Sequence, residues 1–505
     1  MKKEILKLGI LLLSFLFIVA CSSDDDIQIP DPGSTPVTIN NPDEEIDDFV
    51  WKAMNFWYLY KPDVTDLQDS KLDNVDTYRR FLNSYDAPEN LFDALLTKRT
   101  LQGLPEDQFS FVVNDYIALE QEFSGVSKSN GMEFQLGRIG DSNDLFGFVT
   151  YVLPGTDAEA KGVIRGDIFT TINGTQLTVS NYVDFLFNTD GYDIGFNTIE
   201  NNTLVPAKTL TLNKTEYTEN PIFMSKTIEY KGEKVGYMLY NSFTFGFNKE
   251  LNDAFAAFKN DQISHLILDL RYNGGGSVYT ATALASMITG GYTGEVFAKS
   301  IYNPDVQAIV NNQSNADSFL NDRFLDNVIV DFENNIEEPI NSLGLQKLYV
   351  LATRSSASAS ELVINGLTSY IDVIHIGAQT RGKYQASRTL YDSEDLGREG
   401  VNQNHTYALQ PLVSKVSNKD GNTDYITGFT PLVPFDEDFQ NLGVIGETSE
   451  PFLNAALEYI VNNSIPAVRS KEGFMKFEMV GESKMNRRSY QKMYLDRPLK
   501  GLTLK

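Results

Sequence analysis

The sequence is poor in the residues that most often build metal sites and disulfides. It has one cysteine and three histidines in 505 residues. A single cysteine excludes an intrachain disulfide and every cysteine-rich zinc or iron–sulfur site. Three histidines without an HExxH pattern give no basis for a histidine-built metal site, so we expect neither a metal nor another cofactor. Beyond the N-terminus no segment holds 18 uninterrupted apolar residues, which predicts no further membrane-spanning segment.

Positive charge is also scarce. The chain has 42 basic and 68 acidic residues, a net charge of −26. Because phosphate contacts require lysine and arginine, this balance argues against a nucleic-acid partner. The 42% apolar and 12% aromatic content predicts folded cores rather than global disorder. At roughly 100–200 residues per domain, the length indicates about three domains.

The lone cysteine follows an apolar segment near the N-terminus. Lys2, Lys3 and Lys7 precede the apolar residues 8–20, and Cys21 comes next. This arrangement resembles the lipobox of bacterial lipoproteins, in which the chain is cut before the cysteine and the thiol is lipidated. The resemblance implies a signal peptide over residues 1–20 and membrane attachment through Cys21. An ordinary secretory peptide with a chance cysteine is the alternative.

The residues after the cysteine bear on where the protein resides. Ser22, rather than aspartate, follows Cys21, which argues against retention in the inner membrane and favours the cell envelope, at the outer membrane. Residues 22–26 (SSDDD) also resemble a surface-export signal of some Gram-negative lipoproteins, with a solvated acidic linker as the alternative. Pro, Asp, Asn and Thr are abundant in the residues that follow, so residues 21–44 are predicted to be a flexible tether.

Four regions follow the tether. Apolar residues near helical spacing predict a helical N-terminal domain over residues 45–123, and short strands and turns predict a β domain over 124–215. Strand–turn–helix order predicts an α/β core over 216–463. The tail, residues 464–505, has ten basic and four acidic residues. It is predicted to be either a solvated tail or an arm that docks on the acidic body or on an anionic surface.

Residues 124–215 resemble a PDZ domain. A helix after Pro154, the Arg165-Gly166-Asp167 turn, a short apolar strand and the Asn173-Gly174 pair occur in that order, and Asn-Gly predicts a type I′ turn. In PDZ domains a loop of backbone N–H groups binds the carboxylate of a peptide, which then pairs as an added strand. The resemblance places peptide binding at Gly131, Met132, Glu133 and Phe134. Glu133 replaces a small residue, which predicts altered carboxylate capture.

Two further segments resemble the C-terminal processing peptidases, also called tail-specific proteases. They are Asp269-Leu-Arg-Tyr-Asn-Gly-Gly-Gly-Ser277 and Ser356-Ala-Ser-Ala-Ser-Glu361, followed by Gly382-Lys383. The resemblance implies a multidomain α/β fold: a helical N-terminal domain, a PDZ-like β domain and a ClpP/crotonase-like peptidase core. It also implies Ser358 as nucleophile, Lys383 as base, and an oxyanion hole from Ala359 and Gly274, or Gly275.

The residue types suit this chemistry. A serine hydroxyl needs a base, and lysine serves only where burial lowers its pKa. Ser358 and Glu361 also form a capping-box pattern, which by itself would make Ser358 an ordinary N-cap. The two interpretations are compatible, because a helix N-terminus stabilises an oxyanion.

The sequence departs from the family after the lysine. The family carries a lysine-orienting glutamine four residues on, where this chain has Ser387, while Gln385 lies two residues earlier. Either is a candidate for that role. His375 is a further candidate base, although its apolar neighbours favour a core histidine.

The predicted function is a lipid-anchored serine endopeptidase acting near protein C-termini. Its partners are protein or peptide substrates with accessible C-termini. The alternative is a catalytically impaired, peptide-binding envelope lipoprotein on the same scaffold.

Overall fold

The computed structural model describes residues 42–201, 203–331, 334–465 and 477–496. The signal peptide, Cys21 and nearly all of the tether lie outside these residues, as does nearly half of the basic tail. In the described ranges, no helix is both long and apolar enough to cross a bilayer.

The N-terminal region is largely helical, as its apolar spacing predicts. Trp51 and Trp57 are buried in α1 and anchor its core. Short strands, which the sequence did not indicate, follow the helices, and β3 pairs with β24 (Ala408–Gln410) of the core. The elements are α1 (Pro42–Trp57), α2 (Val75–Leu82), α3 (Pro88–Ala94), β1 (Thr100–Leu101), β2 (Leu104–Pro105), β3 (Phe111–Val113) and α4 (Tyr116–Phe123), with 3-10 turns at Lys61–Asp63, Thr65–Leu67 and Asp69–Asp73.

Residues 124–215, called the β-domain below, form a sheet of order β10-β9-β7-β6-β5, and β27 (Glu478–Glu482) of the tail is added beside β5. The Asn173-Gly174 pair joins β7 to β8 with positive φ at both residues, which confirms the predicted turn. The elements are β4 (Val126–Ser129), β5 (Met132–Arg138), β6 (Leu145–Val152), α5 (Asp157–Ala160), β7 (Ile168–Ile172), β8 (Thr175–Gln176), α6 (Tyr182–Leu186), β9 (Gly191–Glu200), β10 (Thr203–Asn213) and β11 (Thr215–Thr218).

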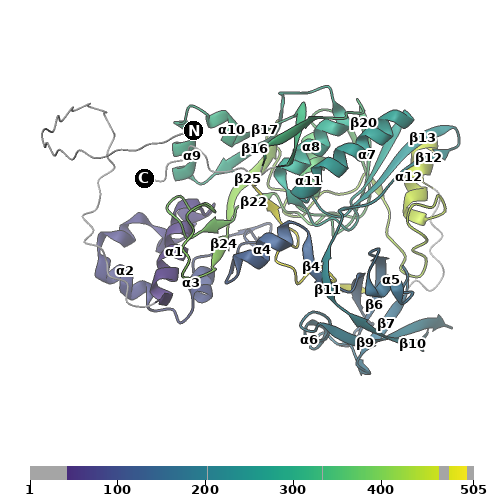
Figure 1. The fold of residues 1–505 in the computed structure, drawn as a ribbon, viewed down its shortest axis with the longest axis horizontal. Coiled ribbons are helices and arrows are strands. Elements are labelled where there is room, and N and C mark those ends of the chain that lie inside the picture. Colours follow the sequence, from purple (N-terminus) through teal and green to yellow (C-terminus); the bar gives the residue numbers. More distant parts are fainter. Residues whose placement is uncertain (1–41, 202, 332–333, 466–476, 497–505) are drawn as a thin grey trace, which may run out of the picture. The chain divides into compact units, whose positions relative to one another are not determined.

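The core is built on a sheet of order β12-β13-β14-β20-β21-β26, parallel from β13 to β26. Leu266 and Leu268 of β14 pack in the cluster that contains residues of α7, α8 and α11, whereas Ile267 packs with α12. Helices therefore cover both faces (Figure 1). The elements are β12 (Ile222–Tyr230), β13 (Glu233–Tyr240), α7 (Asn248–Asp261), β14 (His265–Asp269), α8 (Val278–Thr289), β20 (Lys347–Ala352), α11 (Ala359–Leu367), β21 (Asp372–Gly377), β26 (Val433–Pro434) and α12 (Pro451–Asn462).

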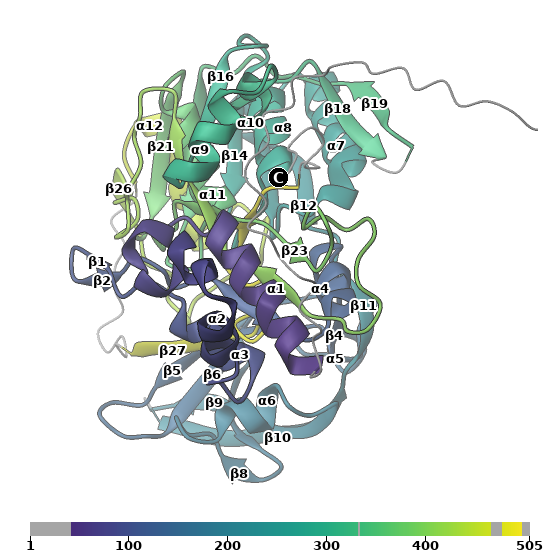
Figure 2. The same ribbon diagram turned by 90° about the vertical axis from the view of Figure 1, so that its left-hand side faces the viewer.

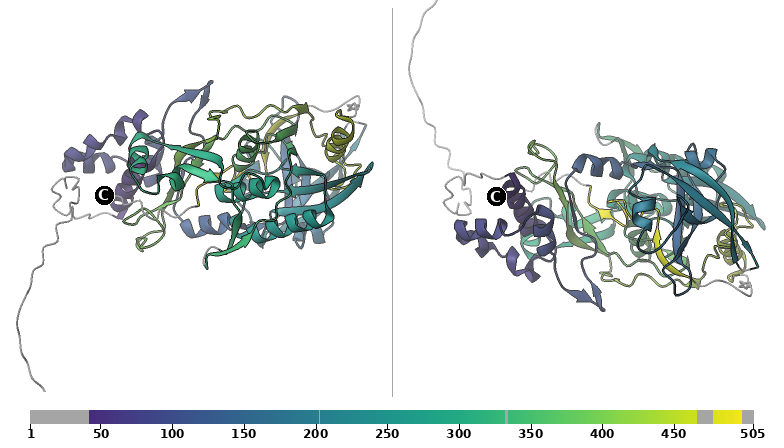
Figure 3. Two further views of the ribbon diagram at one scale, coloured as in Figure 1. Left: turned by 90° about the horizontal axis from the view of Figure 1, so that it is seen from above. Right: turned by 90° about the horizontal axis from the view of Figure 1, so that it is seen from below.

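A second core sheet has the order β15-β28-β22-β25-β16-β17. The described part of the basic tail supplies β27 to the β-domain and β28 to this second sheet, and the yellow tail lies against the blue strands in Figure 3. The remaining elements are β15 (Gly276–Ser277), β16 (Val296–Tyr302), α9 (Pro304–Asn311), α10 (Ala316–Leu320), β17 (Asn321–Arg323), β18 (Asn327–Asp331), β19 (Ile336–Pro339), β22 (Gln385–Ser387), β23 (Leu390–Tyr391), β25 (Leu412–Asn418), β27 (Glu478–Glu482) and β28 (Met493–Tyr494).

Candidate active site

The two segments singled out in the sequence meet at one edge of the core sheet. β14 and β20 are parallel neighbours, so the turns that follow them emerge side by side. The carbonyl oxygen of Asn273 accepts hydrogen bonds from the Ala357 N–H (3.2 Å) and the Ser360 hydroxyl (3.0 Å). The Ser356 hydroxyl donates to the Leu270 carbonyl at 2.7 Å. These bonds fix the glycine turn, residues 273–276, against the serine turn.

The close approach of the two turns requires a glycine at position 275. Its φ is +110°, and a Cβ at this position would lie 2.6 Å from Ser358 Cβ and 3.0 Å from Ala359 N. A side chain there would push the two turns apart, because atoms this close overlap. The glycine turn therefore contacts the residue predicted to be the nucleophile.

Ser358 is the N-cap of α11 and is fully buried. Its φ of 65° and ψ of −116° are unusual for a residue with a side chain, and such a conformation costs about 1–3 kcal/mol. The hydroxyl oxygen faces the Glu361 N–H in a capping box, but it makes no regular hydrogen bond within the described part of the chain. The free hydroxyl thus lies beside the N–H groups and positive dipole end of α11.

Glu361 connects the serine to the lysine loop. Its carboxylate accepts hydrogen bonds from the N–H groups of Ser358 (2.8 Å), Gly382 (2.7 Å) and Lys383 (2.8 Å), and from the Thr380 hydroxyl at 2.6 Å. Burial raises the pKa of Glu361, and these four hydrogen bonds oppose the shift. Sequence reasoning gave Glu361 only a capping role; the structure shows that it also holds the backbone of Lys383 in place.

The Lys383 side chain is shielded from water. It is fully buried, its Nζ has no hydrogen-bond partner in the described ranges, and Nζ lies 4.6 Å from the centre of the Phe109 ring. Burial lowers the pKa of Lys383 well below its ordinary value, and the charge of Lys492 lowers it further. Asp107 and Glu361 act in the opposite direction. A depressed pKa provides the neutral amine that a general base requires.

The N-terminal region and the tail cover the lysine. The N-terminal region contributes Phe109 and also Gln108, whose Oε1 accepts from Arg381 at 2.8 Å. The tail contributes Lys492, whose Nζ donates to the Phe109 carbonyl at 2.7 Å, and burial lowers the pKa of Lys492 to about 7. No local sequence pattern signals these contacts, because the residues lie more than 100 positions from Lys383.

Neither candidate lysine-orienting residue contacts the amine in this structure. The Gln385 side chain donates to Tyr60 Oη (2.9 Å) and to the Glu106 carbonyl (3.0 Å). The Ser387 hydroxyl donates to the Met493 carbonyl at 3.1 Å and accepts from Gln410 Nε2 at 3.1 Å. Each side chain instead bonds to a neighbouring strand or to the N-terminal region.

The candidate oxyanion donors differ in availability. The Gly275 N–H donates to Asn273 Oδ1 at 2.9 Å and is thus engaged. The Gly274 N–H has no acceptor among the described residues. Ala359 opens α11, where backbone N–H groups have no partner within the helix. Gly274 and Ala359 are therefore better placed than Gly275.

In the loop predicted to bind a peptide carboxylate, backbone N–H groups are already engaged in hydrogen bonds. The Gly131 N–H donates to Ser129 Oγ (2.9 Å), and the Met132 N–H donates to Asn130 Oδ1 (3.0 Å). Glu133 is buried and bound by the tail. Phe134 lies in the β-domain core. Side chains of the loop itself thus take the amides that the resemblance reserves for a carboxylate.

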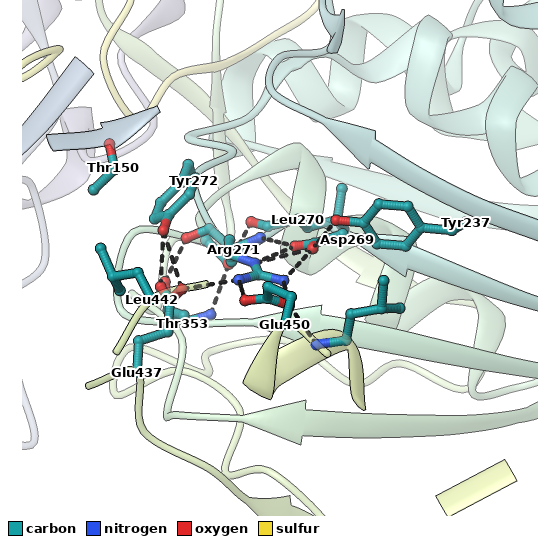
Figure 4. Close-up of polar contacts among 12 residues, drawn as sticks. Thr150, Tyr237, Asp269, Leu270, Arg271, Tyr272, Thr353, Glu437, Leu442 and Glu450 are labelled. Carbon is teal, nitrogen blue, oxygen red and sulfur yellow. Dashed lines mark hydrogen bonds and ion pairs between the residues drawn. The ribbon is translucent and has the colours of Figure 1, made fainter. Parts of the chain in front are cut away.

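A network of buried charges holds Arg271, which lies two residues before the glycine turn. The Arg271 side chain is fully buried and donates to Asp269, Glu437 and Glu450 at 2.6–2.9 Å (Figure 4). Glu437 Oε1 also accepts a hydrogen bond from the guanidinium of Arg165, in the β-domain, at 2.7 Å. These cations lower the pKa of Glu437 against its burial. Arg271 therefore balances carboxylates that would otherwise be buried without a counter-charge.

Two family models match this chain. The family model described as peptidase family S41 matches residues 234–425, and the model of the peptidase S41 N-terminal domain matches residues 45–111. The chain belongs to peptidase family S41. The β-domain lies between the two matched S41 regions, and the predicted serine, lysine and glycine turn all lie within the larger one.

One curated protein and two solved structures illustrate what this chain is similar to. A protein of Staphylococcus aureus described as a probable CtpA-like serine protease is 25% identical over 389 residues, which cover 75% of this S41 chain and 68% of the relative. A solved structure from Bacteroides fragilis, described as a putative S41 protease, is 24% identical, with a TM-score of 0.61, and the match covers 82% of this chain and 97% of that one. That likeness shows the shared fold. The structure of a photosystem II D1 C-terminal processing protease is 19% identical, with a TM-score of 0.48, covering 82% of this chain and all of that one.

Proposed function

We propose that this S41 serine protease is an endopeptidase that cleaves near the C-terminal regions of its substrates through a Ser358–Lys383 dyad. The supporting observation is the joint placement of the two residues. An unpartnered serine hydroxyl and a buried lysine with a depressed pKa are tied to one carboxylate, Glu361. The inert-binder alternative has no support in the relatives, which are described as serine proteases.

The chemistry follows from these positions. Ser358 Oγ attacks the scissile carbonyl carbon while Lys383 Nζ accepts its proton, and the oxyanion forms beside the N–H groups of Ala359 and Gly274. Lysine then protonates the leaving amine, which leaves an acyl-enzyme on Ser358. The neutral lysine activates a water molecule, whose attack releases the acyl product and restores the serine.

The β-domain presents the substrate. An extended peptide would pair with β5 as an added strand, the mode used by PDZ domains. Attachment to the outer membrane through a lipid on Cys21 belongs to the same proposal, and it rests on the lipobox-like sequence alone.

The nucleophile is tested by covalent labelling. A fluorophosphonate probe is expected to modify the unaltered chain at Ser358, as read by peptide mass spectrometry. Ser358→Ala is expected to lose the label and to lower kcat/KM for an unstructured peptide by at least about 10⁴-fold. The matched control is Ser369→Ala, because Ser369 Oγ is also buried and unpartnered. Labelling elsewhere, or full activity of Ser358→Ala, would contradict the assignment.

The base is tested by pH dependence. Since only the neutral amine accepts a proton, kcat/KM is expected to rise with pH through the pKa of Lys383, which lies well below 10.5. Lys492→Met removes a charge that lowers this pKa, so the rise is expected to move to higher pH. A rise centred near pH 4 would instead match His375, whose pKa burial lowers to about 4.

A further inference from the structure

The described part of the tail runs along the strand predicted to receive peptides. β27 pairs antiparallel with β5, with Glu478 opposite Arg138 and Glu482 opposite Gln135 (Figure 2). The pairing is extended by the Ser483 N–H, which donates to the Phe134 carbonyl at 2.9 Å. The chain's own tail thus occupies the β5 edge as an added strand.

Two buried carboxylates, Glu133 and Glu219, called the acidic pair below, then bind basic side chains of the tail. Arg487 donates to Glu133 Oε1 at 3.1 Å and to Glu219 Oε2 at 3.3 Å, and Lys484 donates to Glu219 Oε1 at 2.8 Å. The side chains of Glu133 and Glu219 are only 2% and 8% exposed. The two cations lower the pKa of Glu219 against its burial. Two carboxylates buried this deeply need a cation between them.

Beyond the acidic pair the tail continues to the glycine turn. Gln491 N lies 3.1 Å from where a Cβ of Gly274 would stand, and Lys492 O lies 2.8 Å from that position on Gly275. Met493 then pairs with Gly276. A cavity of about 80 Å³ remains beneath the tail, lined among others by Glu133, Glu219 and Gly275. The β5 edge, the acidic pair and the glycine turn are therefore one continuous track.

We propose that this track is the substrate-binding path, that Glu133 and Glu219 form a subsite for a basic side chain of the substrate, and that residues 478–495 occupy the path as a tethered competitor. The proposal rests on the proposed function. A basic side chain of the substrate would then be recognised in place of its C-terminal carboxylate. The N–H groups of Gly131 and Met132, which would bind a carboxylate, are already bonded within their loop. An internal arginine or lysine, rather than a free C-terminus, sets the position of the bound peptide.

The test measures binding and does not depend on turnover. Every protein is the full chain carrying Ser358→Ala, so a fluorescent peptide with the sequence of residues 477–496 is not consumed. The loosened chain adds Lys484→Gln and Arg487→Gln; Lys484→Gln alone is the milder version. Arg323→Gln, which breaks an exposed pair with Asp317, is the matched control. Circular dichroism and the melting temperature check that each chain folds.

The loosened chain is expected to bind the peptide at least tenfold more tightly than the Ser358→Ala chain alone, and the Arg323→Gln control is expected to match the latter. A peptide with glutamine at positions 484 and 487 is expected to bind the loosened chain at least tenfold more weakly. Adding Glu133→Lys is expected to reverse the preference, towards a peptide with glutamate at position 487. Equal binding by the loosened and control chains, or equal binding of the basic and glutamine peptides, would overturn the proposal. Because binding is measured, and mass spectrometry checks that the peptide stays intact, these outcomes are independent of whether Ser358 is the nucleophile.

Discussion

Replacing Lys383 with methionine is expected to lower kcat/KM by at least about 10³-fold and at the same time to raise the thermal unfolding midpoint. Activity is lost because methionine cannot accept the proton of Ser358. Stability rises because methionine has no charge to desolvate and is close to lysine in length. The native lysine stands fully buried without a hydrogen-bond partner in the described ranges. The site thus holds its base at a cost in folding free energy.

The sign of this effect depends on pH. Burial lowers the pKa of Lys383 in the folded chain, so the unfolded chain binds the extra proton. The cost is fully present below the folded pKa and vanishes as pH rises above the ordinary value of 10.5. The difference in melting temperature between Lys383→Met and the unaltered chain is therefore expected to shrink in alkaline buffer. Lys249→Met, at an exposed ion pair, is the control. A lower midpoint at neutral pH would contradict the predicted cost.

Replacing Arg271 with methionine is expected to destabilise the fold by about 3–5 kcal/mol. The guanidinium is fully buried and contacts Asp269, Glu437 and Glu450, so its removal leaves negative charges in the core without their main counter-ion. Urea denaturation followed by tryptophan fluorescence measures the loss. The glycine turn is attached to Arg271 through the chain, so the active site is expected to be disturbed as well.

Two further variants, one outside this network and one within it, separate the loss of charge from the loss of packing. Arg323→Met removes an exposed partner of Asp317 and is expected to cost about 0–1 kcal/mol. Adding Asp269→Asn to Arg271→Met is expected to recover part of the lost stability, since one fewer carboxylate is then buried without a partner. If the double variant is no more stable than the single one, lost packing against Phe452 rather than unbalanced charge would be the cause.

Much of the core could be predicted from the sequence because the patterns that indicate it lie within short segments of the chain. Apolar strands followed by small-residue turns place the glycine turn and Ser358 at adjacent strand ends, and the structure brings them together. The Asn173-Gly174 turn follows from the backbone preferences of two residues. Both features depend on chain segments of only a few residues.

What the sequence could not indicate depends on contacts between distant segments. Phe109 lies on Lys383, and Arg487 enters the acidic pair with Glu133, although each pair is separated by hundreds of residues. The role of Glu361 was only half visible, because its capping pattern is local but its bonds to the lysine loop are not. The sequence shows Glu133 where PDZ domains carry a small residue, whereas its partner Arg487 is visible only in the fold.

The pairing of β28 with Gly276 has a consequence for biogenesis. Met493 and Gly276 are joined in one sheet, yet ribosomal synthesis places more than two hundred residues between them. A nascent chain that already contains the serine, the lysine and the glycine turn still lacks this strand. Pairings of such long range form late in folding. The finished architecture around the glycine turn is therefore completed only after the last strands have been synthesised.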